Sequence, residues 1–113
     1  MRVLLVDDEL ELRALWREIL EGLEFTVSVA GSVTEALGLL EDGARFDVAV
    51  VDWTLPDGVG SDVLRAIRKV DGSTAVIYAS GLGPLLPATH GGDAVLDKPF
   101  KMRDLAATIR SFA

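Results

Sequence analysis

Short, continuous apolar runs alternate along the chain with segments in which apolar residues recur at helical spacing. The first run is VLLV, residues 3–6. The segment after it carries apolar side chains at helical intervals, namely Leu12, Leu15, Trp16, Ile19 and Leu23. Strands without polar alternation are typical of parallel sheets that are covered by helices on both faces. The pattern therefore predicts alternating strands and helices, the order of an α/β protein.

Five strands are expected in this alternation, over residues 3–6, 25–29, 46–51, 75–78 and 93–97. The second helix begins with the S-x-x-E capping box of residues 32–35, and the last helix is expected over residues 101–112. Strands joined in this way by right-handed crossovers predict an open, doubly wound parallel sheet. Such sheets carry their sites at the carboxyl ends of the strands.

One segment departs from the alternation. GLGPLLPATHGG, residues 81–92, contains two prolines and four glycines, a composition that disfavours a regular helix. We therefore expect a loop with at most one short turn between the fourth and fifth strands. His90, the only histidine, lies in this segment, and we expect its side chain to be exposed to solvent.

Composition limits the class of protein and its surroundings. A chain of 113 residues suits one domain, residues 1–113. No apolar run approaches the roughly 20 residues that span a bilayer, and no signal-peptide pattern is present. The absence of cysteine fits a reducing compartment, so we expect a cytoplasmic protein. A net charge of -7 disfavours direct contact with nucleic acids or acidic membranes, because both are polyanions.

Three carboxylates follow strands that are expected to be neighbours. Asp7 and Asp8 end the first strand, and Asp52 ends the third. In a doubly wound sheet these strands are central and adjacent, so the three acids meet at one edge. Their mutual repulsion requires a cation or a proton, and Mg²⁺ prefers such oxygen ligands. The simpler alternative is that Asp7 and Asp8 only stabilise the start of the following helix.

Two further polar residues follow strands at the same edge. Lys98 ends the fifth strand and precedes Pro99, while Ser80 ends the fourth strand. A lysine, a hydroxyl and carboxylates that bind a metal can together hold a phosphoryl group, with Asp52 as a possible nucleophile. Each residue also has a simpler interpretation: Lys98 as a surface lysine, Ser80 as a turn former, and Asp52 as the last residue before a turn.

The segments VLLVDDE, VVDWTLPDGVG, VIYASG and LDKPF, in this order, resemble the receiver domain of bacterial two-component response regulators. The resemblance covers nearly the whole chain. It implies a flavodoxin-like (CheY-like) sheet of order 2-1-3-4-5, here with the fourth helix shortened or replaced by a loop. It also implies that Mg²⁺ is held by Asp7, Asp8, Asp52 and the backbone carbonyl of Thr54.

The resemblance implies a signalling role rather than a metabolic one. Asp52 would be the phosphoacceptor, and the domain would catalyse only its own phosphorylation and dephosphorylation. Lys98 would pair with a phosphoryl oxygen, and Ser80 would be the hydroxyl that moves to meet it. The implied partners are a histidine kinase or phosphotransfer protein and a downstream protein or fused output domain. The implied assembly is a monomer or a phosphorylation-dependent dimer.

Two features depart from the family pattern and keep an alternative open. Val95 stands three positions before the lysine, where the family usually has an aromatic switch residue. The segment between Ser80 and Lys98 is also short and rich in proline. The alternative is a pseudo-receiver, an interaction module that does not use phosphorylation. A third candidate, a Mg²⁺-dependent aspartyl-phosphate phosphohydrolase, is disfavoured because Asp52-Trp53-Thr54 lacks the second acid of a D-x-D motif.

Overall fold

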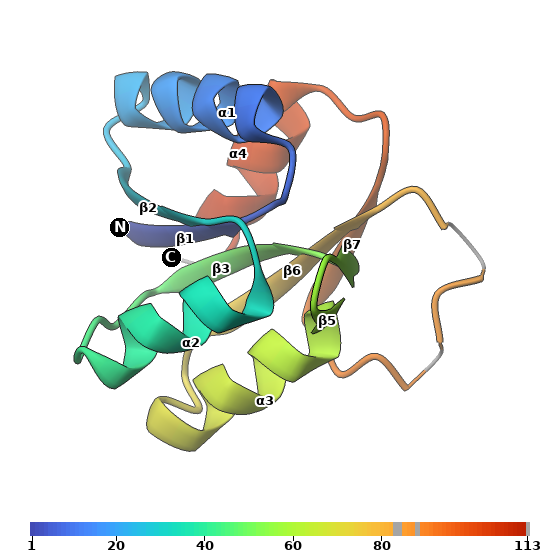
Figure 1. Cartoon of the computed structure of the whole chain (residues 1–113). Coiled ribbons are helices and arrows are strands. Elements are labelled where there is room, and N and C mark those ends of the chain that lie inside the picture. The colour runs from blue at the N-terminus through green and yellow to red at the C-terminus, as the bar shows by residue number, and fades with distance from the viewer. Residues whose placement is uncertain (83–84, 88, 113) are drawn as a thin grey trace.

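A parallel sheet of five strands forms the middle layer of the protein (Figure 1). The computed structural model describes residues 1–82, 85–87 and 89–112. Its elements, in chain order, are β1 (Arg2–Val6), α1 (Leu10–Gly22), β2 (Thr26–Ala30), α2 (Val33–Glu41), β3 (Val48–Asp52), β4 (Thr54–Leu55), β5 (Gly58–Val59), α3 (Gly60–Val70), β6 (Ala75–Ser80), β7 (Ala94–Asp97) and α4 (Met102–Arg110).

The order of strands in the sheet is β2-β1-β3-β6-β7, and all neighbours are parallel. Numbered along the chain, these five strands have the order 2-1-3-4-5, so the predicted fold class is confirmed. The strand boundaries lie within two residues of those expected from the apolar runs. None of the helices in the described residues is long and apolar enough to cross a membrane.

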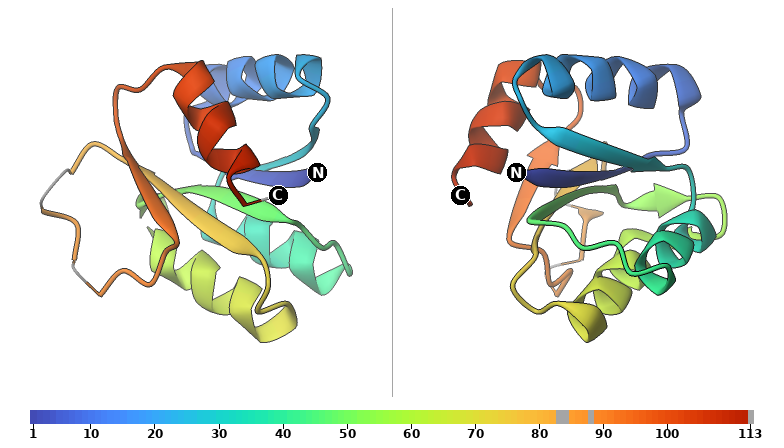
Figure 2. Two further views of the ribbon diagram at one scale, coloured as in Figure 1. Left: turned by 180° about the vertical axis from the view of Figure 1, so that it is seen from behind. Right: turned by 90° about the vertical axis from the view of Figure 1, so that its left-hand side faces the viewer.

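Helices cover both faces of the sheet, α1 and α4 on one side and α2 and α3 on the other (Figures 1 and 2). Alternate strand residues divide between two core clusters: Leu4 and Val6 of β1 face α2 and α3, whereas Val3 and Leu5 face α1 and α4. Because both faces are covered, these four residues are at most 1% exposed. The unbroken apolar runs of the sequence follow directly from this double coverage.

Some residues of the helical apolar patterns are more exposed than expected. Leu15 and Leu23 were expected on the buried side of the first helix but are 51% and 39% exposed, and Leu20 is buried instead. Phe112 lies beyond the end of α4 and is also partly exposed. The buried side of α1 is set by Trp16 and Leu20, which are four residues apart, so Leu15 is turned away from the sheet.

The connection between β6 and β7 is irregular, as the prolines and glycines predicted. Residues 81–82, 85–87 and 89–93 form no α-helix. A small element that the sequence analysis missed lies nearer the site: β4 and β5 form a two-stranded antiparallel ribbon directly after β3.

Candidate functional site

The register of the sheet places the carboxyl ends of β1 and β3 beside each other. Val6 of β1 pairs with Val51 of β3 in parallel. The next residue along the chain is an aspartate in both places, Asp7 after Val6 and Asp52 after Val51. Asp7 is 1% exposed, and its Oδ1 accepts a hydrogen bond of 2.9 Å from the amide of Glu9 at the start of α1. The Asp7 carboxylate therefore lies buried at the end of β1, and its hydrogen bond from Glu9 fixes its orientation.

Three carboxylates come together at this edge. Asp7, Asp8 and Asp52 each offer an oxygen, and these oxygens lie within 4.8 Å of one another. Asp7 is buried, Asp52 is partly buried and Asp8 is exposed, so the group faces solvent on one side. Three hard oxygen donors with an open side match the coordination that Mg²⁺ uses, in which protein carboxylates are combined with water or phosphate oxygens.

Lys98 joins two of these acids. Its Nζ lies 3.1 Å from Oδ2 of Asp7 and 3.4 Å from Oδ2 of Asp52. The lysine side chain is 23% exposed and the two carboxylates less so. In such partly buried surroundings an ammonium between two carboxylates reduces their mutual repulsion.

The pKa values of the site follow from burial and from this pairing. Burial raises the pKa of Asp52 above its ordinary value, Lys98 opposes the rise, and the charge of Asp7 adds to it. Burial works to lower the pKa of Lys98, but its hydrogen bond to Asp7 and the charges of both acids outweigh burial and raise it. Lys98 is therefore held as a cation beside the two carboxylates.

Ser80 and Thr54 lie beside this group. Ser80, at the end of β6, is 1% exposed, and its Oγ accepts a hydrogen bond of 3.0 Å from the amide of Leu82. The backbone oxygen of Ser80 accepts a hydrogen bond of 2.8 Å from the amide of Lys98, which holds the two residues at neighbouring strand ends. Thr54 donates its amide to Oδ1 of Asp52 at 3.3 Å. The Ser80 hydroxyl is thus the first anchor of the loop that follows β6.

A series of aromatic contacts connects the acid site to this loop. The ring of Trp53 lies edge-on to Tyr78, with centroids 5.2 Å apart, and Tyr78 lies edge-on to His90 at 5.4 Å. The Tyr78 hydroxyl donates a hydrogen bond of 3.0 Å to the backbone oxygen of His90, and burial raises the pKa of Tyr78 to about 12. A Cβ on Gly60 or Gly92 would lie 2.8 Å from the Tyr78 ring, so both glycines are needed for this packing.

The expectation that His90 is exposed was wrong. Its side chain is partly buried against Tyr78, and its Nδ1 accepts a hydrogen bond of 2.9 Å from the amide of Gly92. Tyr78, the residue that holds the loop, was not predicted from the sequence either. The available signal was a large aromatic side chain inside the buried run AVIYAS, with glycine on the segments that pass it.

Asp57 is a second residue that the sequence analysis missed. Its carboxylate accepts hydrogen bonds from the amides of Val33 and Thr34, at 2.8 and 2.9 Å, and from the Thr34 hydroxyl at 2.6 Å. These bonds connect the ribbon after Asp52 to the first turn of α2, where Ser32 is the N-cap, as the capping box predicted. The bonds from Thr34 and Val33 lower the pKa of Asp57.

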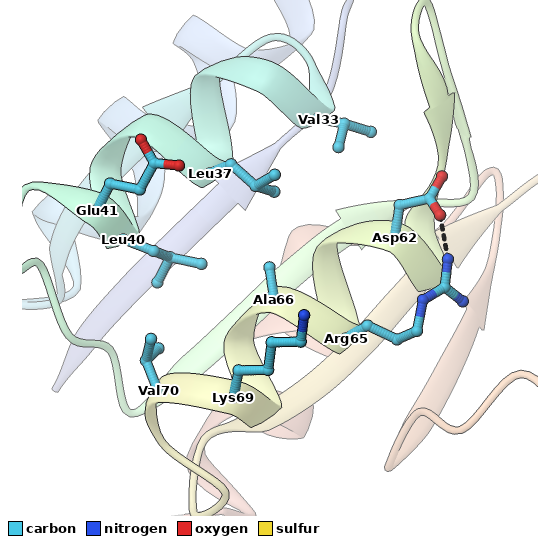
Figure 3. A pocket seen from close by; sticks show the side chains of 9 residues that line it. All are labelled: Val33, Leu37, Leu40, Glu41, Asp62, Arg65, Ala66, Lys69 and Val70. Carbon is cyan, nitrogen blue, oxygen red and sulfur yellow. Dashed lines mark hydrogen bonds and ion pairs between the residues drawn. The ribbon is translucent and has the colours of Figure 1, made fainter.

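A separate hollow lies between α2 and α3, and none of the three acids lines it (Figure 3). It has a volume of about 450 Å³, and Leu37, Leu40 and Ala66 are among the apolar residues that line it. Charged side chains stand around it, including the ion pair between Asp62 and Arg65. The hollow contains neither the carboxylate group nor Lys98.

Comparison with known proteins decides the family. The model of the response regulator receiver domain matches residues 3–110. This chain belongs to that family. The transcriptional regulatory protein CpxR of Escherichia coli (strain K12) is 37% identical over 113 residues, an alignment that covers 97% of this chain and 48% of CpxR. The chain therefore spans about half the length of this curated relative.

Solved receiver structures have the same fold. The Francisella response regulator 1452 receiver domain has a TM-score of 0.86 at 29% identity, over 98% of this chain and 94% of that one. The response regulator TrrA of Thermotoga maritima, solved in complex with Mg²⁺-BeF, has a TM-score of 0.87 at 24% identity, over 99% of this chain and 98% of that one. At the latter identity the likeness establishes the fold alone.

Proposed function

We propose that this receiver domain accepts a phosphoryl group on Asp52 from the phosphohistidine of a histidine kinase or phosphotransfer protein. The observation that carries the proposal is the meeting of three carboxylates, from two strand ends, with the ammonium of Lys98. If Asp7 and Asp8 only stabilised the start of α1, neither Asp52 nor Lys98 would need to lie beside them. A phosphoryl site needs an acceptor carboxylate together with cations that offset the charge of the transferred group.

Asp7, Asp8 and Asp52 are the residues that we propose to hold Mg²⁺, with the backbone carbonyl of Thr54 as a fourth ligand. The donor set fits, because all three side chains offer carboxylate oxygens and the exposed Asp8 leaves room for water and phosphate oxygens. Bound Mg²⁺ would supply positive charge that offsets the acids and the phosphoryl oxygens.

The proposed reaction exchanges one bond to phosphorus for another. A carboxylate oxygen of Asp52 attacks the phosphorus atom, and the P–N bond of the phosphohistidine breaks. The electron pair of that bond remains on the imidazole of the partner. Lys98 already lies 3.4 Å from Oδ2 of Asp52, so a small shift of its ammonium pairs it with a phosphoryl oxygen. The domain thereby promotes its own modification and its later hydrolysis.

Ser80 and the loop after it supply a proposed route for the signal. In the unmodified protein the Ser80 Oγ accepts the amide of Leu82. If the hydroxyl moves to meet a phosphoryl oxygen, that contact is lost and the described residues of the loop, 81–82, 85–87 and 89–92, are repositioned, which is a known kind of switch. Val95 cannot act as an aromatic switch and is 36% exposed, so the loop carries the change in this proposal.

The downstream partner in this proposal is another protein or an output domain fused to the receiver. CpxR, about twice the length of the matched region, is named a transcriptional regulatory protein. Residues 1–113 would act as a single receiver domain that makes no direct contact with nucleic acid or membrane. We propose that it works in the cytoplasm, and that it is a monomer or dimerises on phosphorylation.

Intact-mass measurement tests the proposed function. The protein is incubated with Mg²⁺ and a small phosphodonor such as acetyl phosphate, beside Asp52→Asn. We expect the unmodified chain to gain the mass of one phosphoryl group and Asp52→Asn to gain none. No gain in either protein would favour the pseudo-receiver, a reading that Val95 and the irregular loop would suit. Rapid consumption of the donor without accumulation would favour a phosphohydrolase.

Hydrogen exchange tests the proposed route through the loop. Exchange of residues 81–92 is compared with and without Mg²⁺ and beryllofluoride, an analogue of the phosphoryl group. We expect the exchange rates of these amides to change on binding, while β2, at the edge of the sheet, stays constant as an internal reference. Equal protection of the loop in both states would exclude it as the switch.

A further inference from the structure

The indole ring of Trp16 lies next to the ammonium of Lys98. The Lys98 Nζ is 5.6 Å from the centre of the Trp16 ring, within the range at which an ammonium is attracted to an aromatic face. Trp16 lies in α1 and Lys98 follows β7, so the contact joins opposite ends of the sequence. The proposed phosphoryl transfer assigns no role to this tryptophan.

Trp16 is itself held firmly in place. It is 7% exposed, and its ring packs against Phe100 with centroids 5.1 Å apart and planes tilted by 41°. Phe100 follows Lys98 by two residues, so the same short segment carries the lysine and supports the ring beside it. A buried ring fixed in this way presents its face to Lys98 without itself needing to reorganise.

Lys98 has open space beside it into which its side chain could move away from the acids. A hollow of about 310 Å³ is lined by Leu12, Trp16, Lys98, Pro99 and Phe100. Lysine has a long, flexible side chain, and its position between Asp7 and Asp52 is one of several that it could adopt. The aromatic face attracts the ammonium at the site, whereas an aliphatic side chain in the same place would not.

We propose that Trp16 is a positioning residue that keeps the Lys98 ammonium at the acid site as its partner changes from a carboxylate to a phosphoryl oxygen. The inference rests on the proposed role of Asp52 as phosphoacceptor. Trp16 contacts none of the reacting atoms in this scheme and acts only through Lys98. The attraction of the ring for the cation does not depend on which anion Lys98 pairs with. Trp16 therefore attracts the Lys98 ammonium to the acid site both before and after phosphoryl transfer.

A double-mutant cycle in the intact protein tests the inference. The rate of phosphoryl gain from acetyl phosphate and Mg²⁺ is measured for the unmodified chain, Trp16→Leu, Lys98→Met and the double variant. We expect Trp16→Leu to slow the reaction about 3- to 10-fold when Lys98 is present and less than about twofold when it is absent. Trp16→Phe, which keeps an aromatic face, should retain most of the rate, and Mg²⁺ affinity should stay the same in Trp16→Leu.

The outcomes separate this inference from the proposed function. Equal slowing in both backgrounds, or no slowing in Trp16→Leu, would overturn the role of Trp16 while leaving Asp52 as the acceptor. No phosphoryl gain by the unmodified chain would overturn the proposed function, and this inference with it.

A second measurement does not depend on how well Trp16→Leu folds. In a Trp53→Phe background Trp16 is the single tryptophan, and its fluorescence is recorded while Mg²⁺ and beryllofluoride are added. We expect a change that disappears when Lys98→Met is added. A change that persists without Lys98, or no change with it, would contradict the proposal.

Discussion

The ammonium of Lys98 lies 3.1 Å from Oδ2 of Asp7, although 91 residues separate them in the chain. The Asp7 side chain is only 2% exposed. An ionised carboxylate in such a place needs a hydrogen-bonded cation, because burial removes the water that would otherwise stabilise it. Lys98 therefore has a structural task in the unmodified protein as well as its proposed task in phosphoryl transfer.

Lys98→Met should destabilise the metal-free protein, because it leaves Asp7 buried without its cation. We expect the free energy of unfolding to fall by about 2–4 kcal/mol, measured by urea denaturation. Mg²⁺ should stabilise this variant more than the unmodified chain, since it supplies the missing charge. Lys101→Met, at an exposed lysine before α4, serves as the control. Equal stability of Lys98→Met and the unmodified chain would contradict the buried ion pair.

Asp8→Asn should weaken Mg²⁺ binding without destabilising the metal-free fold. Asp8 is exposed, so losing its charge leaves no buried group unpaired and removes one of three like charges. We expect the Mg²⁺ dissociation constant to rise at least about tenfold, measured by isothermal titration calorimetry. Asp97→Asn, at an exposed acid outside the carboxylate group, should bind Mg²⁺ as the unmodified chain does. Unchanged Mg²⁺ affinity in Asp8→Asn would exclude Asp8 as a ligand.

Asp57→Ala should lower the melting temperature at pH 7 by several degrees, because α2 loses the acceptor for its first amides. The pKa of Asp57 is lowered in the folded protein, so its contribution is present above the ordinary value of 3.8 and is lost as the pH falls through the lower folded pKa. The difference between the two proteins should therefore shrink in acid. Asp57→Asn, a neutral side chain of the same shape, separates charge from shape. A difference that grows as the pH falls below 3.8 would contradict this sign.

Tyr78→Phe should loosen the loop before β7. It removes the hydrogen bond to the backbone oxygen of His90, at a cost of about 1 kcal/mol, while the ring still fills its place in the core. Amide exchange near His90 should then rise about fivefold, whereas exchange in β1 stays the same. Exchange near His90 that matches the unmodified protein would show that the hydroxyl does not hold the loop.

The fold and the position of the acids were predictable because both depend on local patterns. Unbroken apolar runs are buried in a parallel sheet, and the residue after each run must then lie at its carboxyl edge. Asp7 and Asp52 are such residues, so their proximity follows once β1 and β3 are neighbours. The loop after β6 was predictable for a similar reason, since proline and glycine disfavour a helix at their own positions, whatever the distant contacts.

The missed features depend on contacts between distant segments. Asp57 has the sequence character of a turn residue, and its use as a cap for α2 requires the two segments to meet in space. His90 is covered only because the loop passes over Tyr78. Leu15 was misplaced because apolar residues on two adjacent faces of α1 leave its rotation about the helix axis open, and only the packing of Trp16 and Leu20 against the sheet fixes it.

The most direct test of the account is to locate the phosphoryl group within the chain. An aspartyl phosphate formed with Mg²⁺ and acetyl phosphate can be reduced with borohydride, which converts that side chain to an alcohol, and peptide mapping then identifies its position. We expect one reduced residue, at Asp52. Reduction at Asp7 or Asp8, or at no residue after phosphodonor treatment, would contradict it.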